Sequence, residues 1–188
     1  VIPSEIDGLP VKYIWDDAFK GNTTLESVTI PDTVHTIGKN AFNGCSNLKE
    51  VNLPEDLSNI GAYAFVGTAI EEIELPSAVE NIQAYAFKDT ALSKINMPAP
   101  LTGLGEGVFY NCDSLTEIDF SPCVSLGSLG TKTFQGCDSL EKITVGEKQK
   151  SIGSYAVTDC PKLSDLSFLS QFTNYGKYAL ANLPLTEY

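Results

Sequence analysis

The amino-acid sequence predicts a repeat solenoid, a right-handed superhelix with a parallel β-ladder on one face and short strands, irregular turns or 3₁₀ turns on the other. Three observations lead to this prediction. A phrase of 22 to 25 residues recurs along the 188-residue chain, and each copy places apolar residues at the same positions. No single copy can bury those positions alone, so the copies must stack.

The recurring phrase divides the chain into about eight coils, which start near Leu25, Leu48, Ile70, Leu92, Leu115, Leu140, Leu163 and Leu185. Periods of this length are typical of leucine-rich repeats. We therefore expect one leucine-rich-repeat domain over residues 1–188, with a partial first unit at 1–24 and a partial last unit at 185–188. The chain opens in the middle of the pattern, so we interpret it as a processed protein or an excised piece.

Each coil opens with the pattern L-x-x-I-x-I, whose positions one, four and six are expected to point inward. Positions four and six alternate as a β-strand requires. A proline ends the strand in four coils, because proline offers no N–H to a ladder; these prolines are Pro31, Pro54, Pro76 and Pro98. A second inward pair follows, such as Val34 and Ile37. One long face of the stack should therefore carry the parallel ladder.

The return path of each coil contains a glycine, an Ala-Phe pair and a small polar residue. The glycines are expected where the backbone needs φ > 0; they are Gly38, Gly61, Gly105, Gly130 and Gly153. The aromatic residues predict one buried stacked column of Phe42, Phe65, Phe87, Phe109 and Phe134. Small polar side chains should satisfy backbone groups at the closing corner; they are Cys45, Thr68, Thr90, Cys112, Cys137, Cys160 and Asn182.

Four of the five cysteines belong to this corner column. Cys112, Cys137 and Cys160 lie in consecutive coils, at a spacing of about 5 Å that would permit a disulfide. Threonine fills the same position in two other coils, however, so packing explains the residue choice. We therefore expect buried free thiols in the column. Cys123 lies in the two-residue insertion of its coil and is expected to be exposed.

The net charge of −12 narrows the classes of partner. An acidic protein lacks the lysines and arginines that displace counterions from phosphates, so no nucleic-acid partner is expected. Anionic membrane surfaces are disfavoured for the same reason. No apolar run reaches the roughly 18 residues of a membrane span, so no membrane insertion is expected. We expect a monomer.

Catalytic and metal-binding patterns are missing from the sequence. The single histidine, His35, lies between inward Val34 and Ile37 and should face solvent. It shares no repeat position with the corner cysteines, so no catalytic triad is expected. Those cysteines have no histidine partner and no C-x-x-C spacing, which argues against zinc. The glycines form no phosphate-binding loop. No enzymatic activity, metal or cofactor is predicted.

Positions three and five of L-x-x-I-x-I should point outward from the ladder, on the face expected to be concave. Position three contains Ser27, Glu50, Glu72, Lys94, Glu117, Lys142 and Asp165, and position five contains Thr29, Asn52, Glu74, Asn96, Asp119, Thr144 and Ser167. Lys94 lies between Glu72 and Glu117, and Lys142 between Glu117 and Asp165, so cross-strand ion pairs are expected.

The middle coils carry the most negative part of this face. The candidate binding residues are Glu50, Asn52, Glu72, Glu74, Asn96, Glu117 and Asp119. They could bind a basic partner, or Ca²⁺ more weakly, since calcium needs about six to eight convergent oxygens. A solvated strand face without a ligand is the alternative. Neither column contains an aromatic residue, which argues against a carbohydrate platform.

The phrase IP-x-x-V-x-x-IG-x-x-AF-x-x-C resembles the Treponema pallidum-type, or BspA-like, leucine-rich repeat. Ile30-Pro31, Ile37-Gly38, Ala41-Phe42 and Cys45 match it fully. The resemblance implies a bacterial surface or secreted protein, non-catalytic, in a family of which some members bind host extracellular proteins. Gln149 departs from the phrase where valine is expected, and Gly146 departs where proline is expected.

Three classes of function follow. The first is an extracellular or cell-surface recognition module that binds an extracellular or host protein, basic in character. The second is a passive spacer within a larger cell-surface protein. The third is a β-helix-type polysaccharide lyase, which would need a basic residue and clustered carboxylates in one groove; Lys94 among Glu72 and Glu117 is the only approximation to it.

Overall fold

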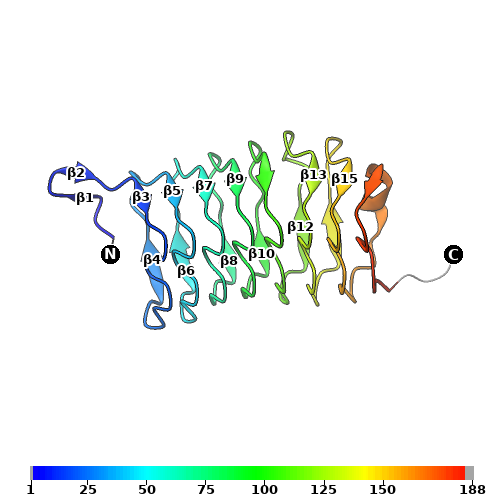
Figure 1. The fold of residues 1–188 in the computed structure, drawn as a ribbon, viewed down its shortest axis with the longest axis horizontal. Coiled ribbons are helices and arrows are strands. Elements are labelled where there is room, and N and C mark those ends of the chain that lie inside the picture. Colours follow the sequence, from blue (N-terminus) through cyan, green and yellow to red (C-terminus); the bar gives the residue numbers. More distant parts are fainter. Residues whose placement is uncertain (1, 185–188) are drawn as a thin grey trace.

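The computed structural model describes residues 2–184, which form an elongated stack of coils with strands in two rows along the long axis (Figure 1). The predicted solenoid is confirmed. The N-terminal and C-terminal coils lie at opposite ends of the stack. The predicted partial unit at 185–188 lies outside the described residues.

The first row of strands comes from the L-x-x-I-x-I segments. It consists of β4 (Ser27–Thr29), β6 (Glu50–Asn52), β8 (Glu72–Ile73), β10 (Lys94–Ile95), β12 (Glu117–Asp119) and β14 (Lys142–Thr144). Pairing is parallel and joins β4 to β6, β8 to β10 and β12 to β14. An isolated bridge joins Lys142 to Asp165. The first row is therefore three separate two-stranded sheets.

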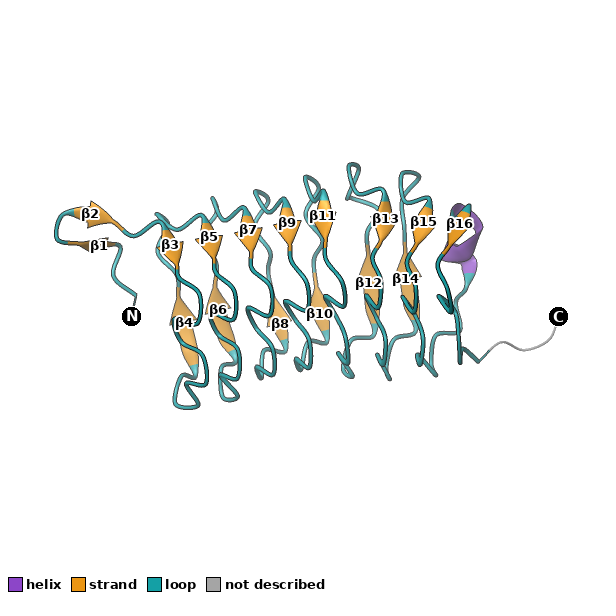
Figure 2. Ribbon diagram, in the orientation of Figure 1, coloured by secondary structure: helices purple, strands orange, loops and turns teal. Residues whose placement is uncertain are grey.

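A second row of strands runs alongside the first (Figure 2). It consists of β3 (Tyr13–Ile14), β5 (Thr36–Ile37), β7 (Asn59–Ile60), β9 (Asn81–Ile82), β11 (Gly103–Leu104), β13 (Ser128–Leu129), β15 (Ser151–Ile152) and β16 (Asn174–Tyr175). Five of these strands form one parallel sheet in the order β11-β9-β7-β5-β3, and three form another in the order β13-β15-β16. The second row thus has longer sheets than the first.

Two elements depart from the repeat at the ends of the stack. A hairpin of β1 (Glu5–Ile6) and β2 (Leu9–Pro10) extends beyond the N-terminal coil (Figure 1). The 3₁₀-helix η1 (Ser167–Gln171) lies in the C-terminal coil. Across the described chain, no helix has the length and apolar character needed to cross a bilayer.

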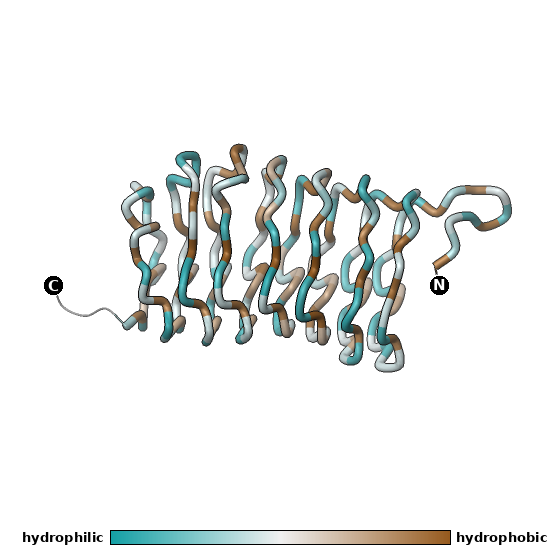
Figure 3. The backbone as a smooth tube through the Cα atoms, turned by 180° about the vertical axis from the view of Figure 1, so that it is seen from behind, coloured by the Kyte–Doolittle hydropathy of each residue, from teal (hydrophilic) through white to brown (hydrophobic). Residues whose placement is uncertain are grey.

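The core confirms the predicted aromatic column. Neighbouring rings of Phe42, Phe65, Phe87, Phe109 and Phe134 stack with centroids 5.4 to 5.9 Å apart, and all five side chains are fully buried. Phe19 extends the column, 5.2 Å from Phe42. Figure 3 shows apolar residues recurring in each coil, so every coil contributes to one continuous core.

The predicted reason for the repeated glycines is wrong. Gly61 and Gly153 do not have positive φ; within the repeat, positive φ falls two residues later, at Tyr63 and Tyr155 for these two coils. A Cβ atom on Gly61 would lie 2.6 Å from the carbonyl carbon of Gly38 in the preceding coil, closer than real Cβ contacts come. Close backbone approach between coils therefore requires glycine at this position.

The corner column works largely as predicted. The Thr90 hydroxyl donates to the Phe87 carbonyl oxygen at 2.8 Å, and the Cys112 thiol donates to the same oxygen at 3.1 Å. All five cysteines are free and buried, which confirms the unbridged column. The prediction for Asn182 is wrong by one residue: its amide donates to Asp159, and buried Leu183 occupies the corner position.

The prediction that Cys123 is exposed is wrong, because its side chain is fully buried. Its thiol donates to the Pro98 carbonyl oxygen of the preceding coil at 3.4 Å. The inserted residues bend outward at Ser121 and Pro122, both exposed, and the chain turns Cys123 back into the core. The insertion therefore widens one corner without opening the core to solvent.

Candidate functional site

All seven predicted binding residues are exposed on the outward face of the first row. Register places Glu72 beside Lys94, Glu117 beside Lys142, and Asp119 beside Thr144. Glu50 and Asn52 pair with Ser27 and Thr29 on the N-terminal side. The structure therefore puts the predicted residues on one continuous surface, which we call the first-row face.

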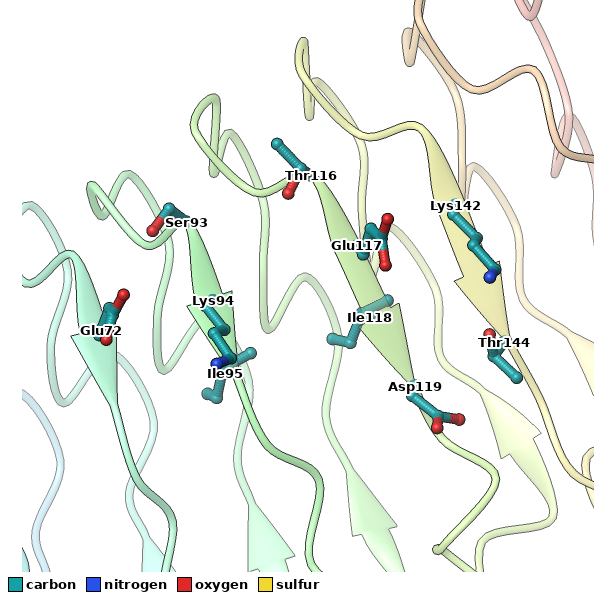
Figure 4. A pocket seen from close by; sticks show the side chains of 10 residues that line it. All are labelled: Glu72, Ser93, Lys94, Ile95, Thr116, Glu117, Ile118, Asp119, Lys142 and Thr144. Atoms are coloured by element: carbon teal, nitrogen blue, oxygen red, sulfur yellow. The ribbon is translucent and has the colours of Figure 1, made fainter.

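The largest hollow on this face lies across β10 and β12 (Figure 4) and has a volume of about 530 Å³. Ile95 and Ile118, at 7% and 3% exposure, form its apolar floor. Its charged rim consists of Glu72, Lys94, Glu117, Asp119 and Lys142. An open hollow with an apolar floor and charges of both signs suits a protein side chain better than a single ion.

Two smaller hollows of about 340 and 270 Å³ lie between β6 and β8. Asn52 and Glu74 line both of them, Glu55 lines the larger, and Glu50 and Glu72 line the smaller. Lys49 is the only cation on their rims, so this part of the first-row face is strongly negative. Six of the seven predicted residues thus line three neighbouring hollows.

The predicted ion pairs along the row do not form. Within residues 2–184, the side-chain nitrogens of Lys94 and Lys142 both lie more than 4.0 Å from every carboxylate oxygen. Ion pairs form elsewhere, the closest between Lys132 and Glu106 at 2.7 Å. Exposed pairs gain about 0–1 kcal/mol, too little to hold two long side chains together. The rim charges of the first-row face therefore remain available to a partner.

Two of the seven residues are partly engaged within the protein. Asn96 accepts the N–H of Leu75 at 2.7 Å and donates to its carbonyl oxygen at 2.9 Å, so its amide already bonds to the preceding coil. Asp119 accepts the N–H of Ser121 at 2.8 Å with one oxygen. Asn96 lines none of the three hollows. The Asn96 side chain thus takes the place of main-chain hydrogen bonds between the two coils.

A second polar cluster lies on the turns of the opposite side. The Tyr85 hydroxyl donates to Glu106 at 2.6 Å, and Lys132 binds the same carboxylate oxygen. The bond from Lys132, and then that from Tyr85, lowers the pKa of Glu106. Tyr63 stacks on Tyr85 with centroids 5.3 Å apart. These groups satisfy one another, unlike those of the first-row face.

The sequence prediction missed an apolar surface at the N-terminal end. Ile6, Leu9, Tyr13 and Trp15 are 58%, 70%, 52% and 77% exposed and line a hollow of about 570 Å³. One signal was present in the sequence. Since Ile14 pairs with Ile37, Trp15 occupies the position that glycine takes at Gly38. A tryptophan there could have marked this end as different from the regular coils.

The described residues contain no group of three or more His, Cys, Asp or Glu side chains arranged to hold a metal ion. His35 is partly buried rather than fully solvent-facing, and its Nδ1 lies 3.3 Å from the Asp56 carbonyl oxygen. Burial raises the pKa of Cys112 to about 12 and that of Cys123 to about 11. Neutral buried thiols are poor nucleophiles and poor metal ligands.

Comparison with known proteins gives the family. The family model for the BspA type leucine-rich repeat region matches residues 12–125 and 80–188, in six copies. No curated protein sequence matches the chain. The crystal structure of a Treponema pallidum leucine-rich repeat protein is similar at 29% identity and a TM-score of 0.83, covering 96% of this chain and 85% of that one.

A Bacteroides ovatus leucine-rich repeat protein is similar at 29% identity and a TM-score of 0.91, over 98% of this chain. This chain covers 49% of that protein, or about half its length. The pneumococcal vaccine antigen PcpA, at 20% identity and a TM-score of 0.54 over 87% of this chain and 42% of that one, shares the fold alone. The chain belongs to the BspA-type leucine-rich-repeat family.

Proposed function

We propose that the protein is a non-catalytic interaction module, extracellular or on the bacterial cell surface, that binds a basic extracellular or host protein through the first-row face. The observation that carries the proposal is the set of exposed carboxylates around three hollows, none of them paired with a lysine. Family membership supports an interaction role, because solenoids of this kind offer extended binding surfaces.

Electrostatics favour a cationic partner for this face. Glu50, Glu72 and Glu74 lie within two neighbouring coils. Like charges so close together create a negative field, which speeds encounter with a positive surface and weakens as salt is added. The carboxylates act as hydrogen-bond acceptors and charge complements, and neither as acids nor as bases.

Ion pairing no longer explains why Lys94 lies among carboxylates, but this does not make the hollow the active site of a lyase. Lys94 and Lys142 share a hollow with three carboxylates, and no ion pair accounts for them. All five groups are exposed, however. Catalytic acids and bases commonly lie in sites where burial and close charges tune their proton affinities, whereas these side chains lie open to solvent. The spacer alternative predicts that no surface of the protein binds a partner more tightly than ordinary protein surface does.

A random peptide library displayed on phage tests the proposal. Panning against the wild-type protein should enrich peptides rich in lysine and arginine, which a triple variant Glu50→Gln, Glu72→Gln, Glu74→Gln does not bind. The control variant replaces exposed carboxylates away from the hollows, Glu26→Gln, Glu80→Gln and Glu147→Gln, with the same loss of charge. Equal binding by all three proteins would contradict binding through the first-row face and would leave the spacer alternative or a binding surface elsewhere.

A further inference from the structure

The hollows of the first-row face lie where its main-chain pairing is interrupted. The paired strands are β4 with β6, β8 with β10, and β12 with β14, so β6 is not hydrogen-bonded to β8 and β10 is not hydrogen-bonded to β12. We call these interruptions the β6–β8 seam and the β10–β12 seam. The two smaller hollows lie at the first seam, and the 530 Å³ hollow is centred on the second.

The strands on either side of each seam remain neighbours in the stack (Figure 1). The second row is continuous past the β6–β8 seam, from β3 to β11, but it is interrupted between β11 and β13, in the same two coils as the β10–β12 seam. Those two coils are joined instead at their turns, where the Gly107 and Phe109 N–H groups donate to the carbonyl oxygens of Thr131 and Thr133 at 2.9 and 3.0 Å. At each seam the coils therefore stay joined, by second-row pairing at the β6–β8 seam and by the turns at the β10–β12 seam. A seam of this kind is a rigid, pre-formed slot, which lowers the entropy cost of binding.

The two seams differ in chemistry. The β6–β8 seam is lined by Glu50, Glu55, Glu72 and Glu74 with a single lysine, and suits one basic side chain. The β10–β12 seam has an apolar floor of Ile95 and Ile118 beneath a mixed rim. Its floor suits an aliphatic or aromatic side chain, which buries apolar surface against the isoleucines.

The spacing of the seams sets the spacing of the two anchors. From one seam to the other is two coils, or about 10 Å at the usual 4.8 Å between parallel strands. A peptide in the extended polyproline II conformation advances about 3.1 Å per residue with three residues per turn, so side chains three positions apart lie on the same face, about 9 Å from each other. A single extended segment along the stack can therefore place one side chain in each seam.

We propose that the partner of the first-row face is an extended polypeptide segment with a lysine or arginine in the β6–β8 seam and an apolar residue, three positions away, in the β10–β12 seam. This inference rests on the proposed function and specifies its ligand. The basic residue provides steering and orientation. The apolar residue provides the buried anchor that the exposed charges of this face lack.

Blocking the β10–β12 seam tests the apolar anchor separately from the charges. Thr144 lines that hollow, and Thr144→Tyr places a ring over it. Thr29→Tyr is the matched control, since Thr29 has the same position in its first-row strand but lines none of the three hollows. Neither change touches a buried side chain, and thermal melting of both variants checks that the fold is intact.

The probe is the same random peptide library on phage, panned against wild type and both variants. Wild type and Thr29→Tyr should enrich Lys or Arg three positions from an aliphatic or aromatic residue. Thr144→Tyr should lose the apolar preference, and wild-type-selected peptides should bind it at least about tenfold more weakly, a change of about 1.4 kcal/mol. Charge-dependent binding without this spacing, or unchanged binding to Thr144→Tyr, overturns the two-seam ligand but leaves the proposed function standing. Binding that ignores the Glu50, Glu72 and Glu74 changes overturns both.

Discussion

The side-chain nitrogen of Gln149 donates a hydrogen bond to the carbonyl oxygen of Cys123, 2.8 Å away in the preceding coil. The same nitrogen donates to the Leu126 carbonyl oxygen at 2.7 Å, and the Gln149 oxygen accepts the N–H of Gly146 at 2.6 Å. Gln149 is fully buried where the repeat would have valine. It satisfies main-chain groups that the two-residue insertion takes out of the regular pattern.

Restoring the consensus at Gln149 should therefore harm the protein. Gln149→Val leaves the carbonyl groups of Cys123 and Leu126 without this donor, and each unsatisfied buried group costs about 1–3 kcal/mol. Urea unfolding should show a loss in that range or above. Leu126→Val, which removes one methylene group from the adjacent core, is the control and should cost about 0.5–1.5 kcal/mol. A Gln149→Val protein as stable as wild type would remove this role.

The aromatic column predicts a graded response to truncation. Phe87→Ala removes a ring stacked on both sides and should lower the free energy of unfolding by about 3–5 kcal/mol. Phe19→Ala should cost less, because Phe19 is only partly buried and stacks on Phe42 alone. Urea unfolding of the two variants measures the difference. Equal losses would contradict the position of Phe19 at the end of the column.

The glycine position predicts a clash rather than backbone strain. Gly61→Ala should cost about 1–3 kcal/mol, because its methyl group would press on the backbone of Gly38. Gly127 is the matched control: no atom lies within 4 Å of its added Cβ, and its φ is outside the left-handed region. Gly127→Ala should be neutral or stabilise by up to about 1 kcal/mol. Thermal unfolding of both variants decides the matter, and equal stability would mean that the coils can move apart.

The buried thiols predict a loss of stability at alkaline pH. Burial raises the pKa of both Cys112 and Cys160 from the ordinary 9.0 to about 12. In the unfolded chain these thiols ionise near pH 9, while in the folded chain they stay protonated. Their contribution is therefore complete below pH 9 and is lost as pH rises from about 9 towards 12.

A threonine variant isolates this effect, since threonine occupies the same column at Thr68 and Thr90. Cys112→Thr with Cys160→Thr should show a shallower fall in urea stability between pH 8 and pH 10.5 than wild type. Native wild type should also resist thiol reagents at pH 8 and release five thiols on denaturation. Identical pH slopes in the two proteins, or fewer than five thiols, would count against the buried free column.

Inward positions could be predicted from the sequence because they repeat. Phe87 and Cys112 obey a spacing that every coil shares, and stacking converts that spacing directly into burial. The outward positions could be predicted from the sequence only in part. Glu72 and Lys94 lie side by side as predicted. Their solvated side chains do not form an ion pair, because adjacency alone does not hold them together.

Features that break the repeat could not be predicted from it. The direction of Cys123 depends on how an insertion is accommodated, and that is settled by Gln149 from the next coil. The seams of the first row depend on which main-chain groups pair, which no residue pattern encodes. Trp15 departs from the repeat by replacing its glycine, but the exposure of Trp15 follows from its position at the end of the stack.

Hydrogen–deuterium exchange of the protein with and without a wild-type-selected library peptide tests the binding surface most directly. Bound peptide should slow exchange in segments 49–53, 71–75, 93–97 and 116–120, which surround the two seams. Protection confined to the turns bearing Tyr63 and Tyr85, or to the N-terminal end around Tyr13 and Trp15, would contradict binding by the first-row face.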